Sequence, residues 1–209
     1  MSQTFDKLTE EKKNNIIHAC ISEFASHGYL NASTNSIVKK AGISKGALFN
    51  YFGNKKKLYF YMVDMAINRF IELGKQDDTP MSSDLFERLK ERGLKKLKMA
   101  TREPLLYAMI YNTFVNLPDN LKNEITSKYA WMHERSNDNL LEDLDVSLFR
   151  ESINPEKAIE IVQLFLEGYF QKKMSTFKNM TPEESLLYYD QMNEECNAYF
   201  EEFKIMFYK

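Results

Sequence analysis

Apolar side chains recur at three- and four-residue spacing along most of the chain, which is the pattern of amphipathic helices. Near the N-terminus Ile17, Ile21 and Phe24 keep this spacing. Thr9 before them is a suitable N-cap, and Gly28 after them is a suitable helix exit. We therefore predict a first helix between these two residues.

Three shorter helices are predicted next. Each opens with a serine or asparagine, whose side chain can accept hydrogen bonds from the first free backbone amides of a helix. The predicted ranges, cap residue first, are Ser33 to Gly42, Ser44 to Phe52, and Asn54 to about Leu73.

The stretch "GKQDDTPMSSD", residues 74–84, has the composition of a linker. Beyond it the periodicity remains helical, and prolines stand at first-turn positions, where the missing N–H costs little. No strand and no repeat is predicted. The fold class is all-α with about nine helices: a head over residues 1–54, a connecting fourth helix over 55–73, and a body over 84–209. The further helical segments are 84–101, 104–116, 120–144, 155–178 and 182–208.

Composition is that of a globular protein, with 44% apolar and 13% aromatic residues. Residues 1–57 hold nine lysines and four acidic residues, a net charge of +5, whereas the rest holds 19 basic and 26 acidic residues. A basic head on an acidic body is expected when only the head meets a polyanion. Cys20 and Cys196 have no pair spacing and are expected to be buried thiols. No apolar segment resembles a signal peptide or membrane span, so we expect a cytoplasmic protein.

Residues 33–52 read as a short helix, a glycine-containing turn and a second short helix, the helix-turn-helix layout that places its second helix in the major groove of DNA. Leu48 and Phe52 share one face of the second helix and should pack inward. The remaining positions should point outward, where aromatic and lysine side chains together suit nucleic acid; they are Lys45, Gly46, Phe49 and Tyr51.

Lys55, Lys56 and Lys57 stand at the predicted start of the fourth helix. A helix N-terminus carries partial positive charge, so lysines there are mildly unfavourable. A phosphate held over this helix start would offset that effect, because backbone amides and lysines would both bind it. Alternatively, the three side chains simply point into water.

The segment "IVKKAGISKGALFNYFGNKKKLYFYM" resembles the DNA-binding signature of TetR-type transcriptional regulators. The resemblance implies an operator-binding homodimer in which Thr34 binds mainly phosphate, Lys45 reads a base or the backbone, and Gly46 permits close approach. Phe49 departs from the usual tyrosine and could contact a thymine methyl instead of a phosphate. The DNA-binding residues that the resemblance implies are Thr34, Asn35, Lys45, Gly46, Phe49, Tyr51 and Lys55.

The last predicted helix carries an apolar stripe with strict three-four alternation, which suits packing against another helix. The resemblance implies a dimer formed by the last two long helices, where Gly168 would allow close approach. The alternative is that the stripe packs on the chain's own core. The candidate interface residues are Gly168, Tyr189, Cys196, Phe200 and Phe203.

Aromatic residues of the body suit a pocket for an apolar or aromatic ligand, and equally an ordinary core. The resemblance favours a body that senses a small molecule, and so a ligand-responsive regulator. We expect a repressor that a small lipophilic or aromatic effector releases from a palindromic operator. The pocket candidates are Tyr107, Tyr111, Phe114, Trp131, Phe165 and Tyr169.

An enzyme is the first alternative. His18 and His27 lie on opposite sides of the first helix, and the sequence contains no HExxH, G-x-S-x-G or glycine-rich phosphate loop. We therefore expect no enzymatic activity, no metal and no cofactor. The second alternative is a helical adaptor that binds only protein through its head.

Overall fold

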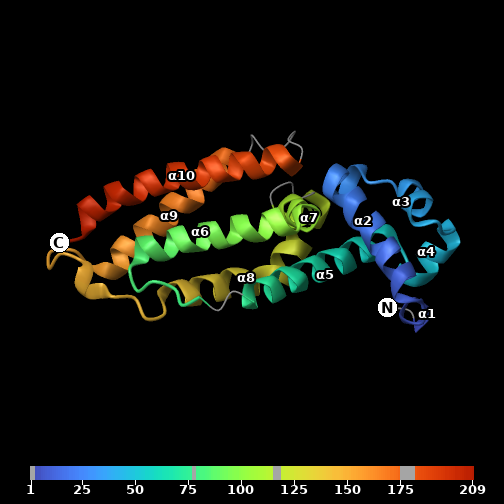
Figure 1. The fold of residues 1–209 in the computed structure, drawn as a ribbon, viewed down its shortest axis with the longest axis horizontal. Coiled ribbons are helices and arrows are strands. Elements are labelled where there is room, and N and C mark those ends of the chain that lie inside the picture. The colour runs from blue at the N-terminus through green and yellow to red at the C-terminus, as the bar shows by residue number, and fades with distance from the viewer. Residues whose placement is uncertain (1–2, 77–78, 115–118, 175–181) are drawn as a thin grey trace. The chain divides into compact units, whose positions relative to one another are not determined.

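The computed structural model describes residues 3–76, 79–114, 119–174 and 182–209, and these ranges fold into helices without a named strand (Figure 1). The predicted all-α class is confirmed. The chain divides into two compact units, Met1–Asp77 with Glu103–Ile125, and Asp78–Arg102 with Thr126–Lys209.

The first unit contains the predicted head. The caps expected from the sequence are confirmed: Ser33 Oγ accepts from the amide of Ser36 at 3.4 Å, and Asn54 Oδ1 accepts from that of Lys57 at 2.9 Å. Gly42 ends its helix at φ +65°, a left-handed conformation that suits glycine. The helices of this unit are α1 (Gln3–Asp6), α2 (Glu10–Asn31), α3 (Thr34–Ala41), α4 (Lys45–Phe52), α5 (Lys55–Lys75) and α7 (Pro104–Phe114), followed by the 3-10 turn η1 (Asp119–Leu121).

Two elements of this unit differ from the expectation. The short helix α1 places Phe5 in the core, with its ring 4.9 Å from that of Phe52. Helix α7, which the sequence assigned to the body, is bound to the head helices. Its Thr113 hydroxyl lies 2.9 Å from the Tyr59 hydroxyl, and its Asn112 amide donates to the carbonyl of Ala25 at 2.6 Å.

The second unit contains the long helices expected for the body. The ends of the predicted segments 104–116 and 155–178 lie outside the described residues. The elements are α6 (Leu85–Arg102), α8 (Lys122–Leu141, in this unit from residue 126), the 3-10 turn η2 (Val146–Leu148), α9 (Pro155–Met174) and α10 (Pro182–Phe207).

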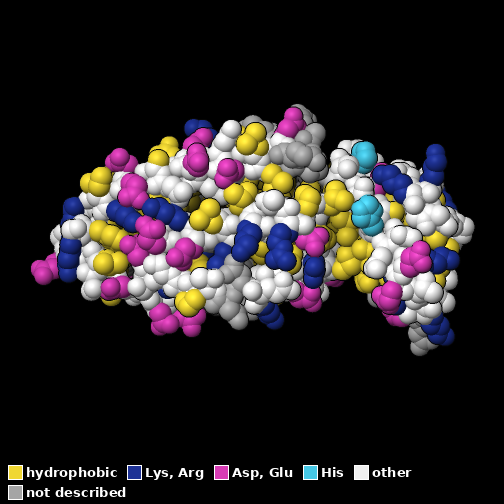
Figure 2. Space-filling model, in the orientation of Figure 1, with side chains coloured by type: hydrophobic (Ala, Val, Ile, Leu, Met, Phe, Trp, Pro, Cys, Tyr) yellow, Lys and Arg dark blue, Asp and Glu magenta, His cyan; other side chains and the backbone are white. Residues whose placement is uncertain are grey.

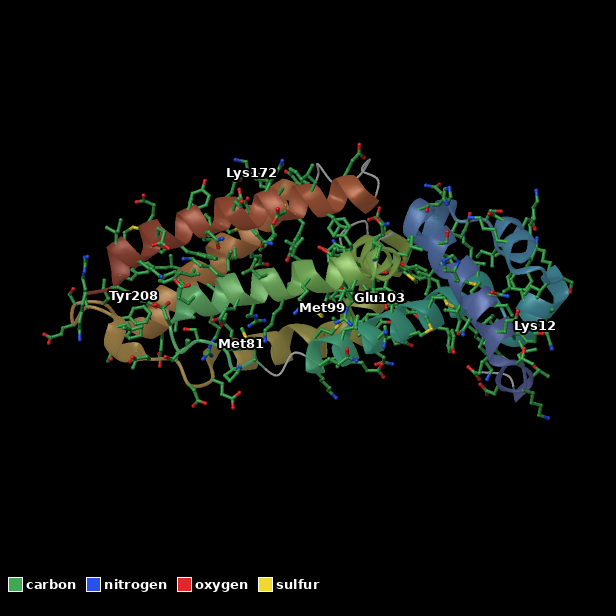
Figure 3. All side chains as sticks on the ribbon, viewed as in Figure 1. Lys12, Met81, Met99, Glu103, Lys172 and Tyr208 are labelled. Atoms are coloured by element: carbon green, nitrogen blue, oxygen red, sulfur yellow. The ribbon has the colours of Figure 1, made fainter. Side chains whose placement is uncertain are left out.

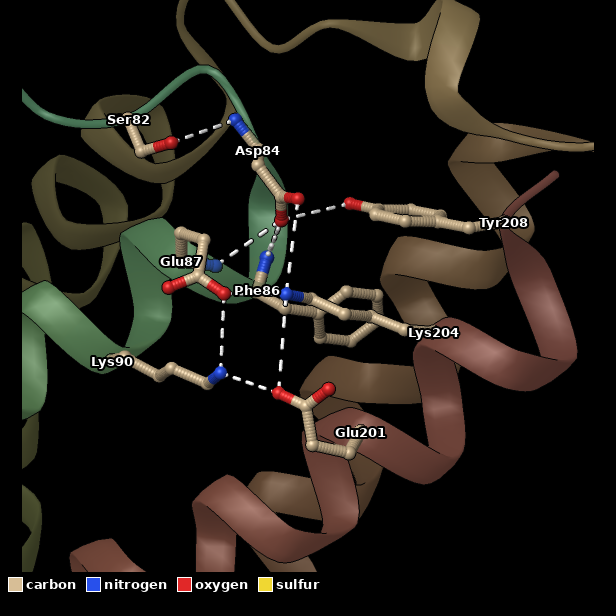
Figure 4. Close-up of polar contacts among 8 residues, drawn as sticks. All are labelled: Ser82, Asp84, Phe86, Glu87, Lys90, Glu201, Lys204 and Tyr208. Atoms are coloured by element: carbon tan, nitrogen blue, oxygen red, sulfur yellow. Dashed lines mark hydrogen bonds and ion pairs between the residues drawn. The ribbon is translucent and has the colours of Figure 1, made fainter.

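The start of α6 is attached to the end of α10 by a polar network (Figure 4). Asp84 Oδ1 caps α6 by accepting from the amide of Phe86 at 2.8 Å, and it also accepts from the Tyr208 hydroxyl at 3.1 Å. Lys90 pairs with Glu201 at 2.5 Å. Tyr208, labelled in Figure 3, also lies with its ring 5.2 Å from that of Phe86. These contacts fix the two helices at one end of the unit.

The predicted stripe of α10 packs inside its own unit. The Phe86 ring of α6 lies 5.8 Å from that of Phe200 and stacks 6.2 Å from that of Phe203. Four of the candidate interface residues are therefore covered within a single chain. The buried candidates are Tyr189, Cys196, Phe200 and Phe203.

Gly168 alone among those candidates is exposed, and a Cβ added there would meet no described atom within 4 Å. Large apolar side chains of the same two helices are also exposed. Ile161 and Leu164 on α9 are 48% and 61% accessible, and Leu187 on α10 is 63% accessible. An interface on α9 and α10 would therefore use these residues in place of the buried ones.

Candidate nucleic-acid interface

Helices α3 and α4 form the helix-turn-helix that the sequence predicts. Ile37 of α3 and Leu48 of α4 are fully buried, and Phe52 is 6% accessible, so the inward face is confirmed. In the turn, the amide of Ile43 donates to the carbonyl of Val38 at 3.1 Å. Ser44 then caps α4 by accepting from the amide of Ala47 at 3.1 Å. The hydrogen bond of the turn and the cap at Ser44 together hold α4 at a fixed angle to α3.

The outward residues of α4 divide into two groups. Lys45 and Gly46 in the first turn are exposed, and Lys45 has no ion pair within the described part of the chain. Phe49 and Tyr51 are half-buried, and the Tyr51 ring lies 5.7 Å from that of Phe5. The first turn of α4 is therefore its most accessible part, as expected for a helix that meets the major groove with its N-terminal residues.

Gly46 has no structural reason to be glycine. Its φ is not positive, and a Cβ added there would meet only Ser44 Oγ, at 3.9 Å. Glycine in an exposed helix position lowers stability by about 1 kcal/mol relative to alanine. A glycine that the fold does not require, next to an exposed lysine, indicates a surface that another molecule approaches closely.

The start of α3 is organised by Glu23 of α2, which is 3% accessible. Its carboxylate accepts from the amide of Ser33 at 3.0 Å, from the hydroxyl of Ser36 at 2.6 Å and from the ammonium of Lys40 at 3.2 Å. Because Thr34 lies between two of these partners, Glu23 positions the turn that carries Thr34 and the exposed Asn35.

Burial alone would raise the pKa of Glu23, but the hydrogen bonds from Ser36, Ser33 and Lys40 lower it below its ordinary value of 4.5. Glu23 is not among the residues predicted from the sequence. The available signal was a single carboxylate inside the apolar run "CISEFA" of a helix that precedes the motif.

The three lysines at the start of α5 have three different surroundings. The Lys55 ammonium donates to the carbonyl of Leu30 at 3.1 Å and lies 5.1 Å above the Tyr29 ring. Desolvation lowers the pKa of Lys55, opposed by the charge of Glu23. Lys56 pairs with Glu124. Lys57 is exposed and, among the described residues, has no ion pair. Of the three lysines, Lys55 is thus the one that contacts α2 of the head.

The six ligand-pocket candidates are distributed over both units. In the first unit Tyr107 lies 6.1 Å from Phe70 and 6.3 Å from Tyr111, measured between ring centroids, and Phe114 is half-buried. In the second, Phe165 and Tyr169 pack with each other at 5.8 Å, and Trp131 is 40% accessible.

The structure has a cavity in each unit, and none of the six candidates lines either of these two. A cavity of about 620 Å³ in the first unit is bordered by α2, α5 and α7, and one of about 520 Å³ in the second is bordered by α6, α9 and α10. Both volumes are in the range of small-molecule sites.

The expected buried thiols are confirmed. Burial raises the pKa of Cys20 to about 12, and the pKa of Cys196 is raised to about 11 by burial and the nearby Glu195. In the described ranges, no three His, Cys, Asp or Glu side chains are grouped so that they could hold a metal ion. The search of those ranges also found no helix with the length and apolarity needed to cross a membrane.

Comparison with known proteins adds to this geometry. Residues 16–62 match the family model described as bacterial regulatory proteins, tetR family. The match begins within α2, includes α3 and α4, and ends within α5. The biofilm operon icaADBC HTH-type negative transcriptional regulator IcaR of Staphylococcus epidermidis is 25% identical over 160 residues, which are 76% of this chain and 82% of that protein.

The fold of the whole chain is shared with solved structures. A TetR family transcriptional regulator from Chloroflexus aurantiacus superposes with a TM-score of 0.65 at 20% identity, over 100% of this chain and 98% of that one. The fatty acid degradation regulator FadR from Bacillus halodurans superposes with a TM-score of 0.57 at 18% identity, over 87% and 95% of the two chains.

Proposed function

We propose that this chain is a regulator of the TetR type, a ligand-responsive repressor that binds a pseudo-palindromic operator as a homodimer. A small lipophilic or aromatic effector, bound in one of its cavities, releases it from DNA. The similarity to known helix-turn-helix transcriptional regulators supports this function. We infer the operator symmetry, the effector and the direction of control.

The first turn of α4 is the observation that carries the proposal. Lys45 is an exposed cation with no described ion pair, beside a glycine that no internal contact requires. Lysine at that position can reach base edges in the major groove, and Gly46 lets the helix backbone approach the DNA. The residues proposed to bind DNA are Thr34, Asn35, Lys45, Gly46, Phe49, Tyr51 and Lys55.

Phosphate binding is assigned to the start of α5. The Lys55 ammonium uses one of its three N–H groups on the carbonyl of Leu30, which leaves two for a phosphate. Exposed Lys57 and the free backbone amides of the same turn add to this anion site. Contacts of this kind position a protein on DNA without reading its sequence.

Repression and dimerisation are proposed on different grounds. The Staphylococcus epidermidis relative is named a negative transcriptional regulator, which supports repression. The exposed apolar side chains of α9 and α10, together with exposed Gly168, support a dimer through these helices, because exposed apolar surface marks interaction sites.

The test begins with selecting the preferred sequence from randomised duplex DNA. Labelled selected and scrambled duplexes are then titrated at two salt concentrations with the parent, Lys45→Ala and Lys55→Ala. Lys45→Ala should reduce the preference for the selected duplex by roughly 1–3 kcal/mol if the contact is bidentate to guanine. Lys55→Ala should weaken both duplexes alike and reduce the salt slope by about one unit.

Exposed Lys122 supplies the control, since Lys122→Ala removes a surface lysine outside the motif. If Lys45→Ala and Lys55→Ala bind both duplexes like the parent, the helix-turn-helix does not read DNA. A parent that selects no sequence, and whose binding is weak and insensitive to salt, would instead support the adaptor alternative.

A further inference from the structure

The cavity of the second unit combines an apolar wall with charged side chains. Its volume of about 520 Å³ is enclosed by residues of α6, α9 and α10 together with Leu140. Side chains of these helices project into the space between them (Figure 3), and lysine and arginine side chains stand over α6 on the face shown in Figure 2. The apolar part of the wall includes Leu89, Leu140, Leu166, Phe170 and Phe200.

Lys96 of α6 is the distinctive charged group of this wall. Its side chain is accessible, yet desolvation by the surrounding protein, and then the charge of Arg92, lower the pKa of Lys96 to about 8. Lys96 is one of the residues that line the cavity, so its accessible side chain borders the hollow between the helices. Lys96 makes no hydrogen bond or ion pair within the described residues, so its charge has no counterpart there.

The other charges of the wall do not neutralise Lys96. Lys90 already pairs with Glu87 and Glu201, and Glu160 pairs with Lys157 at 2.6 Å. Glu167 is exposed on α9. Arg92 lies one turn before Lys96 on the same helix and adds positive charge. Lys96 itself therefore has no ion-pair partner among the described residues that line the cavity.

Two further groups of the wall suit an anion. Burial and the nearby Glu195 raise the pKa of the Cys196 thiol to about 11, so this thiol is neutral near pH 7 and does not repel one. Asn193 has a buried amide nitrogen with no hydrogen-bond partner in the described structure. Its amide occupies space left by Gly93, where an added Cβ would lie 2.8 Å from Asn193 Oδ1. Asn193 is also part of the cavity wall, so this unpartnered donor lies beside the space that a ligand would occupy.

We propose that the cavity bordered by α6, α9 and α10 binds an organic carboxylate with an apolar body, its anionic group at Lys96 and its body against Leu140, Phe170 and Phe200. An unpaired cation in a desolvated cavity is unfavourable until an anion joins it, whereas the apolar wall favours a hydrophobic ligand. The inference rests on the proposed function at one point, where the bound carboxylate is taken to be the effector that releases DNA.

Isothermal titration with the full-length protein tests the ligand class without DNA. The probes are saturated carboxylates from hexanoate to tetradecanoate below their micellar concentrations, and for each its neutral amide and its cationic amine of equal length. The variants are Lys96→Met, which removes the charge and keeps the length, and Lys96→Arg, which keeps the charge. Lys98→Met is the matched control, because Lys98 is exposed on the same helix and does not line the cavity.

At least one carboxylate should bind the parent about tenfold or more tightly than its amide, since a charge-assisted hydrogen bond is roughly twice as strong as a neutral one. Lys96→Met should bring the two affinities to within about twofold, whereas Lys96→Arg and Lys98→Met should preserve the preference. Equal binding of acid and amide to the parent, binding of no carboxylate in the series, or a preference that survives in Lys96→Met would each overturn the inference.

The regulatory part is measured separately by titrating the selected duplex with and without the bound carboxylate. If the carboxylate binds as expected but operator affinity is unchanged, the ligand class stands and the effector role in the proposed function fails. If no duplex is selected at all, the titrations without DNA still decide the ligand class.

Discussion

At the scale of single residues, charged groups of the head are placed by helices other than their own. Lys55 opens α5, where a cation is unfavourable, but its ammonium donates to the carbonyl of Leu30, in the last residues of α2 that follow the break at Gly28. Glu23 sits within α2, but its carboxylate lies at the N-terminus of α3. A sequence shows which helix a charge belongs to, whereas tertiary contacts decide which helix end it stabilises.

Replacing Glu23 with glutamine should therefore affect both stability and DNA binding. Glu23→Gln keeps the shape but loses the charge that three donors share, and it should lower the free energy of unfolding by about 1–3 kcal/mol. The loosened start of α3 should weaken binding to the selected duplex while leaving the salt slope unchanged, because no phosphate contact is lost. Urea unfolding and duplex titration measure the two effects, with exposed Glu11→Gln as the control.

The pH dependence of Glu23→Gln has a definite sign. The pKa of Glu23 is lower in the folded chain than its ordinary value of 4.5, so its stabilisation is complete above that value and is lost as the pH falls through the lowered pKa. The stability difference between parent and variant should be constant near pH 7 and shrink below about pH 4. A difference that stays the same down to pH 3 would mean that the carboxylate charge contributes nothing.

At the scale of elements, the helices of the head could be predicted because their ends carry local signals. Ser33, Ser44 and Asn54 cap their helices through their own side chains, so the sequence was sufficient. The helix α1 was not predictable in this way, since four residues show no helical period and only packing of Phe5 gives the helix a reason to form.

The apolar stripe of α10 shows what a local pattern cannot predict. Its three-four alternation indicates that one face is covered, but the same alternation serves a core and a dimer interface equally well. Here Phe200 and Phe203 are covered by Phe86 of the same chain, a contact between residues more than a hundred positions apart. No local pattern carries that information. The same limit applies to the pocket candidates, because an aromatic residue in the sequence suits a core and a pocket equally well.

Helix α4 gives a prediction in which stability and function change in opposite directions. Gly46→Ala adds a methyl group into open space and should stabilise the helix by up to about 1 kcal/mol. The same methyl group should weaken DNA binding, because it keeps the backbone of α4 away from the groove. Gly74→Ala, at an exposed position near the end of α5, is the control that should change stability alone. Unchanged affinity of Gly46→Ala would mean that this turn does not approach DNA.

At the scale of the whole molecule, exposed apolar residues of α9 and α10 predict how two chains associate. Ile161→Glu combined with Leu187→Glu places two charges on side chains that are 48% and 63% accessible, so the protomer should fold normally. The buried charges should disfavour the dimer, and light scattering should give a mass near 24.6 kDa, that of one chain. Val146→Glu on η2, at a residue of 55% accessibility outside these helices, is the control. A double variant with the parent's mass would place the interface on another face.

The proposed symmetric dimer would present two α4 helices, and this arrangement also constrains the DNA. A two-fold dimer places its two α4 helices a fixed distance apart and on one side of the duplex, so its operator should contain two inverted half-sites at a set spacing. Inserting about five base pairs between them rotates one half-site by roughly half a helical turn, to the opposite face of the duplex. Affinity should then fall to that for a single half-site. The Ile161 and Leu187 double variant, as a monomer, should bind original and respaced duplexes equally, because each of its chains reads one half-site. If the parent also binds both alike, its two recognition helices do not act as a rigid pair.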